Sequence, residues 1–126
     1  MEVIGSGLAL VHAWIATLAA VVAAALVVLG VLDALRVVAA RRWLDRLVLV
    51  LVATVVATAI LGPGIVIGVR PPSDPLHFLY ALVAVAAVPT FRLAAQQRRS
   101  DRLGGWLAVG GLVTLGALLR LWATGG

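Results

Sequence analysis

The chain has 126 residues, of which 63% are hydrophobic and only 12% are charged. Soluble domains carry about 25% charged residues, so this composition excludes an ordinary soluble domain and favours one small membrane domain over residues 1–126. The sequence has no cysteine, which excludes disulfides, iron–sulfur clusters and Cys-attached haem. Its net charge of +5 comes from arginines that lie between apolar segments, so we expect no nucleic-acid partner.

Four apolar segments follow one another along the chain, at about residues 8–32, 44–67, 76–91 and 103–122. A helix needs about 20 residues to cross the hydrocarbon core, and backbone in lipid must satisfy its hydrogen bonds internally. We therefore predict an all-α integral membrane protein, folded as an antiparallel bundle of four transmembrane helices. The first segment is too long for a signal peptide and "MEVIGSG" lacks a basic start, so we expect it to be retained.

The arginines indicate how these helices are oriented. Eight of the ten lie in the loops 36–46 and 92–102, whereas Arg70 and Arg120 lie toward the opposite side. The positive-inside rule then places both loops in the cytoplasm and both termini outside. In a bacterium we expect the protein in the cytoplasmic (inner) membrane, with its termini on the periplasmic or extracellular face. His12 and His77 each open a segment that runs toward an arginine-rich loop, so the sequence reads as two similar hairpins, a weak internal repeat.

Three prolines and one aspartate mark expected helix ends and bends. Pro63, within "LGPG", is expected to end or kink the second helix, and Pro89 to bend the third. In "SDPLH", Asp74 is the expected N-cap of the third helix, with Pro75 at the first helical position, where a missing N–H has no consequence.

The only two histidines, His12 and His77, are the main candidates for a binding site. His12 lies about four residues into its predicted helix and His77 three residues after Asp74, so at 1.5 Å per residue both should lie about 5–6 Å below the outer helix ends. The first and third helices of such a bundle are diagonal, with axes roughly 12–14 Å apart. That gap is too wide for two imidazoles to meet, but it suits a haem b whose iron binds one histidine on each face.

Residues around the histidines fit the same cofactor. Arg70 and Arg120 lie in the outer layer and suit the haem propionates, and Tyr80 is one turn below His77. Small side chains that share a helix face with each histidine leave room for a slot that would hold a flat macrocycle, although close helix packing, which membrane bundles use routinely, is the more common reason for them. These are Ala16, Ala19 and Ala23 below His12, and Ala81 and Ala84 below His77.

The four-helix pattern with two outer histidines resembles b-type membrane cytochromes, in particular one half of a heme A synthase. That family uses four-helix units in which two parallel helices each bring a haem-ligating histidine near the outer face, and His12 and His77 match these positions by topology. The family has a glutamate three residues before a ligand histidine, where this chain has Ala9 and Asp74, and its longer signature is absent here. The resemblance implies a bound haem, while these departures tell against synthase chemistry.

Two kinds of function remain open from the sequence. One is a small haem-binding protein for electron transfer or haem handling, working with a redox partner in the lipid bilayer. The other is a cofactor-free accessory or assembly subunit of a larger membrane complex, with its histidines on separate faces; either protein could form a homo-oligomer. A zinc or copper ion would need a further ligand, such as Asp74 or Glu2.

Other functions fit the sequence less well. No carboxylate lies in the middle of a predicted span, which tells against proton-coupled export. The sequence has no nucleophile–base arrangement, phosphate loop or metal motif, so we do not expect a self-contained enzyme. Redox or haem-modifying catalysis through a bound haem stays open.

Overall fold

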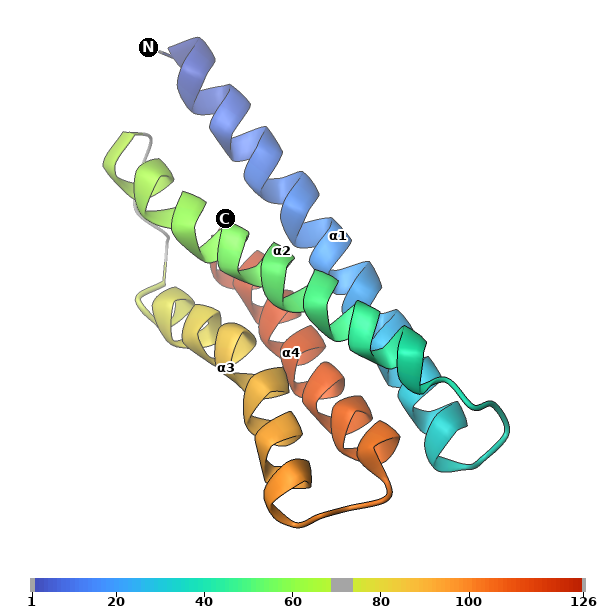
Figure 1. Ribbon diagram of the computed structural model, residues 1–126. Helices are drawn as coiled ribbons and strands as arrows, with labels where there is room; N and C mark the ends of the chain where they lie inside the picture. The colour runs from blue at the N-terminus through green and yellow to red at the C-terminus, as the bar shows by residue number, and fades with distance from the viewer. Residues whose placement is uncertain (1, 69–73, 126) are drawn as a thin grey trace.

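A computed structural model of the chain consists of four helices, α1 (Glu2–Ala34), α2 (Arg41–Gly68), α3 (Leu76–Gln97) and α4 (Leu103–Gly125) (Figure 1). The structure describes residues 2–68 and 74–125, and every regular element within these ranges is an α-helix. The all-α, four-helix prediction is thereby confirmed. Each helix is long and apolar enough to cross a membrane, judged by its length and composition.

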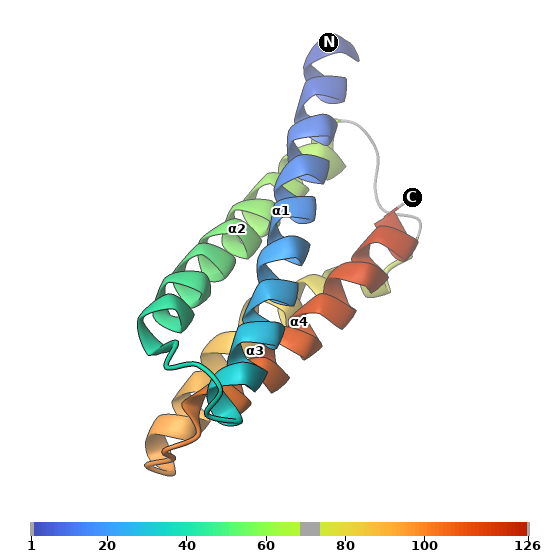
Figure 2. The same ribbon diagram turned by 90° about the vertical axis from the view of Figure 1, so that its right-hand side faces the viewer.

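The helices pack as two antiparallel hairpins, α1 with α2 and α3 with α4. α1 also packs along α4, whereas α2 and α3 touch less extensively, and no contact joins α1 to α3 within the described ranges. α1 and α3, which carry the two histidines, are therefore diagonal, as expected. The two hairpins spread apart toward the end where both termini lie (Figure 2).

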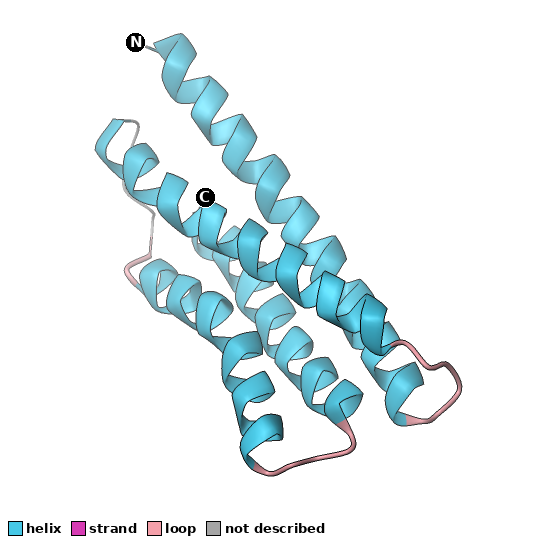
Figure 3. Ribbon diagram, viewed as in Figure 1, coloured by secondary structure: helices cyan, strands magenta, loops and turns pink. Residues whose placement is uncertain are grey.

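The helices are longer than the hydrophobic segments. α1 begins at Glu2 instead of about residue 8, and α3 continues to Gln97 instead of about residue 91. Pro63 does not end α2, which runs on to Gly68, and α3 changes direction along its course and contains Pro89 (Figure 3). Hydropathy marks only the part of a helix that suits lipid, whereas the backbone hydrogen bonds of these helices continue beyond it.

The first turn of α3 differs by one residue from the prediction. The helix begins at Leu76, so Pro75 is its N-cap residue instead of its first residue. Asp74 still acts as a cap, because its Oδ1 accepts a hydrogen bond of 2.8 Å from the Leu76 N–H. The Asp74 carbonyl also accepts one of 3.0 Å from the His77 N–H. The position of His77 at the start of α3 is therefore fixed by backbone bonds to Asp74.

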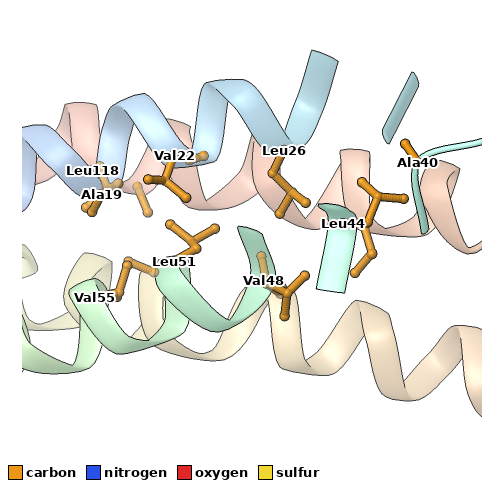
Figure 4. Packing of buried hydrophobic residues seen from close by; sticks show 14 residues of the cluster. Ala19, Val22, Leu26, Ala40, Leu44, Val48, Leu51, Val55 and Leu118 are labelled. Carbon is orange, nitrogen blue, oxygen red and sulfur yellow. The ribbon is translucent and has the colours of Figure 1, made fainter. Parts of the chain in front are cut away.

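A core of small and aliphatic side chains joins all four helices (Figure 4). Leu26, Leu44, Leu51 and Leu107 fill its centre and are almost completely inaccessible. Burying a leucine side chain stabilises a fold by about 1.5–3 kcal/mol in water, but in lipid the gain comes from close packing between helices.

α1 and α4 approach closely at two glycines. A Cβ atom at Gly30 would lie 2.5 Å from the Gly104 carbonyl oxygen, and one at Gly104 would lie 2.7 Å from the Gly30 carbonyl oxygen. Only glycine lets two helix backbones come this near. The pair therefore fixes where the first and last helices cross.

Two ion pairs lie at the end of the bundle with the arginine-rich loops. Arg92 and Asp45 join α3 to α2 at 3.2 Å, and Arg36 and Asp101 join the two loops at 3.8 Å. The second pair is exposed by more than 80% on both sides, and exposed pairs contribute about 0–1 kcal/mol. Packing between helices therefore contributes more to this fold than charge pairing does.

Candidate functional site

His12 lies on α1 with its ring beside α2. Its Cε1 atom is 4.0 Å from the position that a Cβ atom would take at Gly62, so the small Gly62 lets the imidazole approach the α2 backbone. The His12 Nδ1 atom is buried and finds no hydrogen-bond partner among the described residues. A buried polar atom without a partner costs about 1–3 kcal/mol. A ligand at His12 would therefore gain from a nitrogen that the described protein atoms leave unsatisfied.

His77 is the second residue of α3 and turns its ring toward α4. Its Nδ1 atom lies 3.3 Å from Thr124 Oγ1, and the ring also bonds the backbone carbonyl of Leu121. The Thr124 hydroxyl donates its hydrogen to the Arg120 carbonyl at 2.8 Å, so its oxygen accepts from the His77 Nδ1–H. This network assigns the proton of a neutral ring to Nδ1 and leaves the Nε2 lone pair for a metal.

His12 and His77 lie on the diagonal helices α1 and α3, which do not contact each other within the described ranges. Asp74 is near enough to attract a charge on His77. The two rings contact different helices: His12 lies against α2 and His77 against α4. Each ring is therefore placed against a different neighbouring helix.

The expected equal depth below the helix ends is wrong. His12 lies ten residues past the start of α1 instead of about four, which corresponds to about 15 Å along the helix. His77 lies one residue past the start of α3. The first turns of α1 project beyond the other helices (Figure 1), so residue counts from the helix starts do not compare the depths of the two histidines.

The alanines below the histidines serve helix packing in this structure. Those on α1 are buried, as is the deeper one on α3, whereas Ala81 is half-buried. The Ala23 carbonyl oxygen lies 3.3 Å from the position that a Cβ atom would take at Gly111, so α1 and α4 are in close contact at this level. A macrocycle would therefore have to lie beyond the core, toward the chain termini. The buried set consists of Ala16, Ala19, Ala23 and Ala84.

The predicted polar partners differ in their placement. Arg120 is exposed on α4, one turn before Thr124, and so lies at the end of the bundle that carries His77. Tyr80 is half-buried on α3, three residues after His77. Arg70 lies outside the described residues. Arg120 is thus the described cation best placed to pair with a haem propionate.

Sequence reasoning missed three residues that contact the histidine rings: Gly62, Leu121 and Thr124. Gly62 belongs to "LGPG", which reads as a helix breaker, and no local pattern links it to position 12. Thr124 stands four residues after Arg120, a spacing that predicts a bond within one helix but not a contact with α3. These contacts depend on how the helices are rotated against one another.

Acidic and histidine side chains do not converge on a complete metal site in the described ranges. No group of three or more such side chains there is close enough to hold a metal ion. A structural zinc site takes four protein ligands, which two histidines do not provide. A haem supplies its own equatorial ligands, so two histidines are a sufficient axial set.

Comparisons with protein families, with curated proteins and with solved structures found no match to this chain.

Proposed function

We propose that the chain is a small membrane b-type haem protein, with a haem b bound between His12 and His77 and used for electron transfer or haem handling. One observation carries the proposal: the Nδ1 atom of His12 is buried and has no hydrogen-bond partner among the described residues. The sequence has no further histidine and no cysteine, so these two rings are the chain's only imidazole or thiolate ligands for iron. The four long apolar helices are consistent with a place in a membrane.

The two histidines have different roles in this proposal. His77 would bind through Nε2, because its Nδ1–H is directed toward Thr124. Such a bond fixes the ring and makes it a more basic ligand. His12 has no such described partner, so binding at its ring removes an energetic cost. The haem supplies one-electron redox chemistry, and a site near one end of the bundle needs a redox partner on that side.

A reduced-minus-oxidised absorption spectrum of the full chain, purified after expression with haem supplementation, tests the proposal. We expect a Soret band and an α-band typical of six-coordinate, low-spin b-type haem. Titration of the haem-free protein should saturate at one haem per chain. A protein that takes up no haem under these conditions would contradict the proposal.

A second candidate function is a cofactor-free accessory or assembly subunit of a membrane complex. Two observations favour it. The His77 ring already bonds α4, and helix packing occupies the space beside the alanines below the histidines. In that case the histidines are ordinary contacts between helices. Replacing both with alanine should then leave assembly of the partner complex unchanged, and no haem should copurify.

Thr124→Val is expected to weaken haem binding and raise the reduction potential. The variant removes the oxygen that accepts the His77 Nδ1–H, so the imidazole becomes a poorer donor to oxidised iron. Loss of a bond of this kind typically costs 10–100-fold in affinity; since Leu121 still accepts from the ring, we expect roughly tenfold here. Haem titration and a redox titration measure the two effects.

Thr114→Val is the matched control for that variant. Thr114 lies on the same helix and is completely buried, and among the described residues its hydroxyl bonds only the Gly110 carbonyl of its own helix. It should leave the potential and the affinity unchanged. Equal changes in both variants would show that Thr124 acts through stability instead of through His77.

A further inference from the structure

A second polar site lies at the opposite end of the bundle, where the arginine-rich loops meet. A cavity of about 350 Å³ is formed there by the end of α1, the two loops and the first residues of α2 and α4. None of its residues belongs to the proposed haem site. Its charged lining consists of Asp33, Arg36, Arg41, Asp101 and Arg102.

The two carboxylates of the cavity are already engaged. Asp33 Oδ1 accepts a hydrogen bond of 3.0 Å from the Ala40 N–H. Asp33 Oδ2 lies against Gly104, where a Cβ atom would come within 2.6 Å of it. Asp101 pairs with Arg36 at 3.8 Å. Asp33 therefore holds the loop and α4 in place, and Asp101 offsets one arginine.

Two arginines of the cavity remain for a ligand. In the described part of the chain, Arg41 and Arg102 form no ion pair with a carboxylate. α2 begins at Arg41 and α4 at Leu103, so the positive ends of two helix dipoles border the same cavity. A guanidinium pairs well with phosphate oxygens, so the cavity is suited to a phosphate group.

Apolar side chains beside these arginines point to the source of the phosphate. Val38 lines the cavity, and in the same loop Leu35 and Val37 expose more than 60% of their surface, at 68% and 67%. An exposed apolar loop next to arginines suits the boundary between headgroups and acyl chains. A free phosphate ion would make no use of these side chains.

We propose that this cavity binds the phosphate of an anionic phospholipid headgroup, with Arg41 and Arg102 as its principal contacts. Basic pockets between membrane helices are a known means of holding such headgroups. The site does not depend on haem binding, so the two proposals can fail separately.

Native mass spectrometry of the delipidated full chain in detergent tests the site. The probes are dioleoyl phosphatidylglycerol, dioleoyl phosphatidylcholine and inorganic phosphate, titrated separately. We expect one phosphatidylglycerol to bind per chain, more tightly than phosphatidylcholine. At about 1 kcal/mol for each arginine, Arg41→Gln with Arg102→Gln should weaken phosphatidylglycerol binding roughly thirtyfold.

The control is Arg42→Gln with Arg99→Gln, which removes the same charge at the same end of the bundle. Neither of these residues lines the cavity, so binding should change little. Each single variant, R41Q and R102Q, is measured too, in case the double variant does not fold. Three results would each overturn the proposal. The test and control variants could lose phosphatidylglycerol affinity equally, both lipids could bind equally well, or inorganic phosphate could bind more tightly than phosphatidylglycerol.

Discussion

Replacing His12 or His77 with alanine is expected to convert the haem-loaded protein from a low-spin, six-coordinate spectrum to a high-spin, five-coordinate one. Where haem binds between His12 and His77 as proposed, each variant removes one of its two histidine ligands, in a chain with no other histidine and no cysteine. His77→Ala should have the larger effect on affinity, because the His77 ring is oriented by bonds to α4 while the His12 Nδ1 has no described partner. Absorption and electron paramagnetic resonance spectra distinguish the two spin states.

The double variant, H12A with H77A, should lose essentially all haem absorbance. Thr17→Ala is a suitable control, because Thr17 lies on α1 near His12, is exposed and bonds only the Ala13 carbonyl of its own helix. That control should keep the spectrum of the unaltered protein. If the double variant retained haem at full occupancy, the haem would bind at another site or non-specifically, and the proposal would be wrong.

Gly104→Val is expected to lower the free energy of unfolding by about 3 kcal/mol or more, since overpacking typically costs about 1–3 kcal/mol and here the obstacle includes backbone. A side chain at position 104 would meet Asp33 and the Gly30 carbonyl, at 2.6 Å and 2.7 Å from its Cβ atom. The two helices would have to move apart along their contact. Unfolding in detergent, followed by circular dichroism, measures the loss.

Gly7→Ala and Gly116→Ala are the matched controls. A Cβ atom at either position would have no neighbour within 4 Å, counting atoms beyond its own stretch of helix. Alanine favours helix over glycine by roughly 0.5–1 kcal/mol, so both variants should be neutral or slightly stabilised. If Gly104→Val unfolds no more easily than these controls, α1 and α4 do not pack as described.

The four helices could be predicted because hydrophobic length is a strong signal in a membrane protein. Their ends could not. α1 begins six residues before the apolar segment at Leu8, and α2 continues past Pro63, because backbone hydrogen bonding sets the length of a helix and hydropathy reports only its lipid-compatible part. Asp74 was interpretable because capping acts over two or three residues of sequence.

The candidate site was only partly predictable for a different reason. His12 and His77 stand out because they are rare, and their diagonal helices follow from alternating direction along the chain. Gly62 and Thr124 do not stand out, because these helices are apolar all round and their periodicity says little about which face turns inward. The contact of His77 with Thr124, 47 residues apart, depends on helix rotation, which one sequence does not encode locally.

The packing of α4 against both α1 and α3 bears on how the protein is made. If the helices are inserted in chain order, α1 and α2 are in place before α4, and the contact of Gly30 with Gly104 forms only when α4 arrives. His77 likewise gains its Thr124 and Leu121 partners only then. α1 and α4, which are far apart in the sequence, thus close the bundle together. A cofactor held by His77 in this orientation would be acquired after translation of α4, not during insertion of the first hairpin.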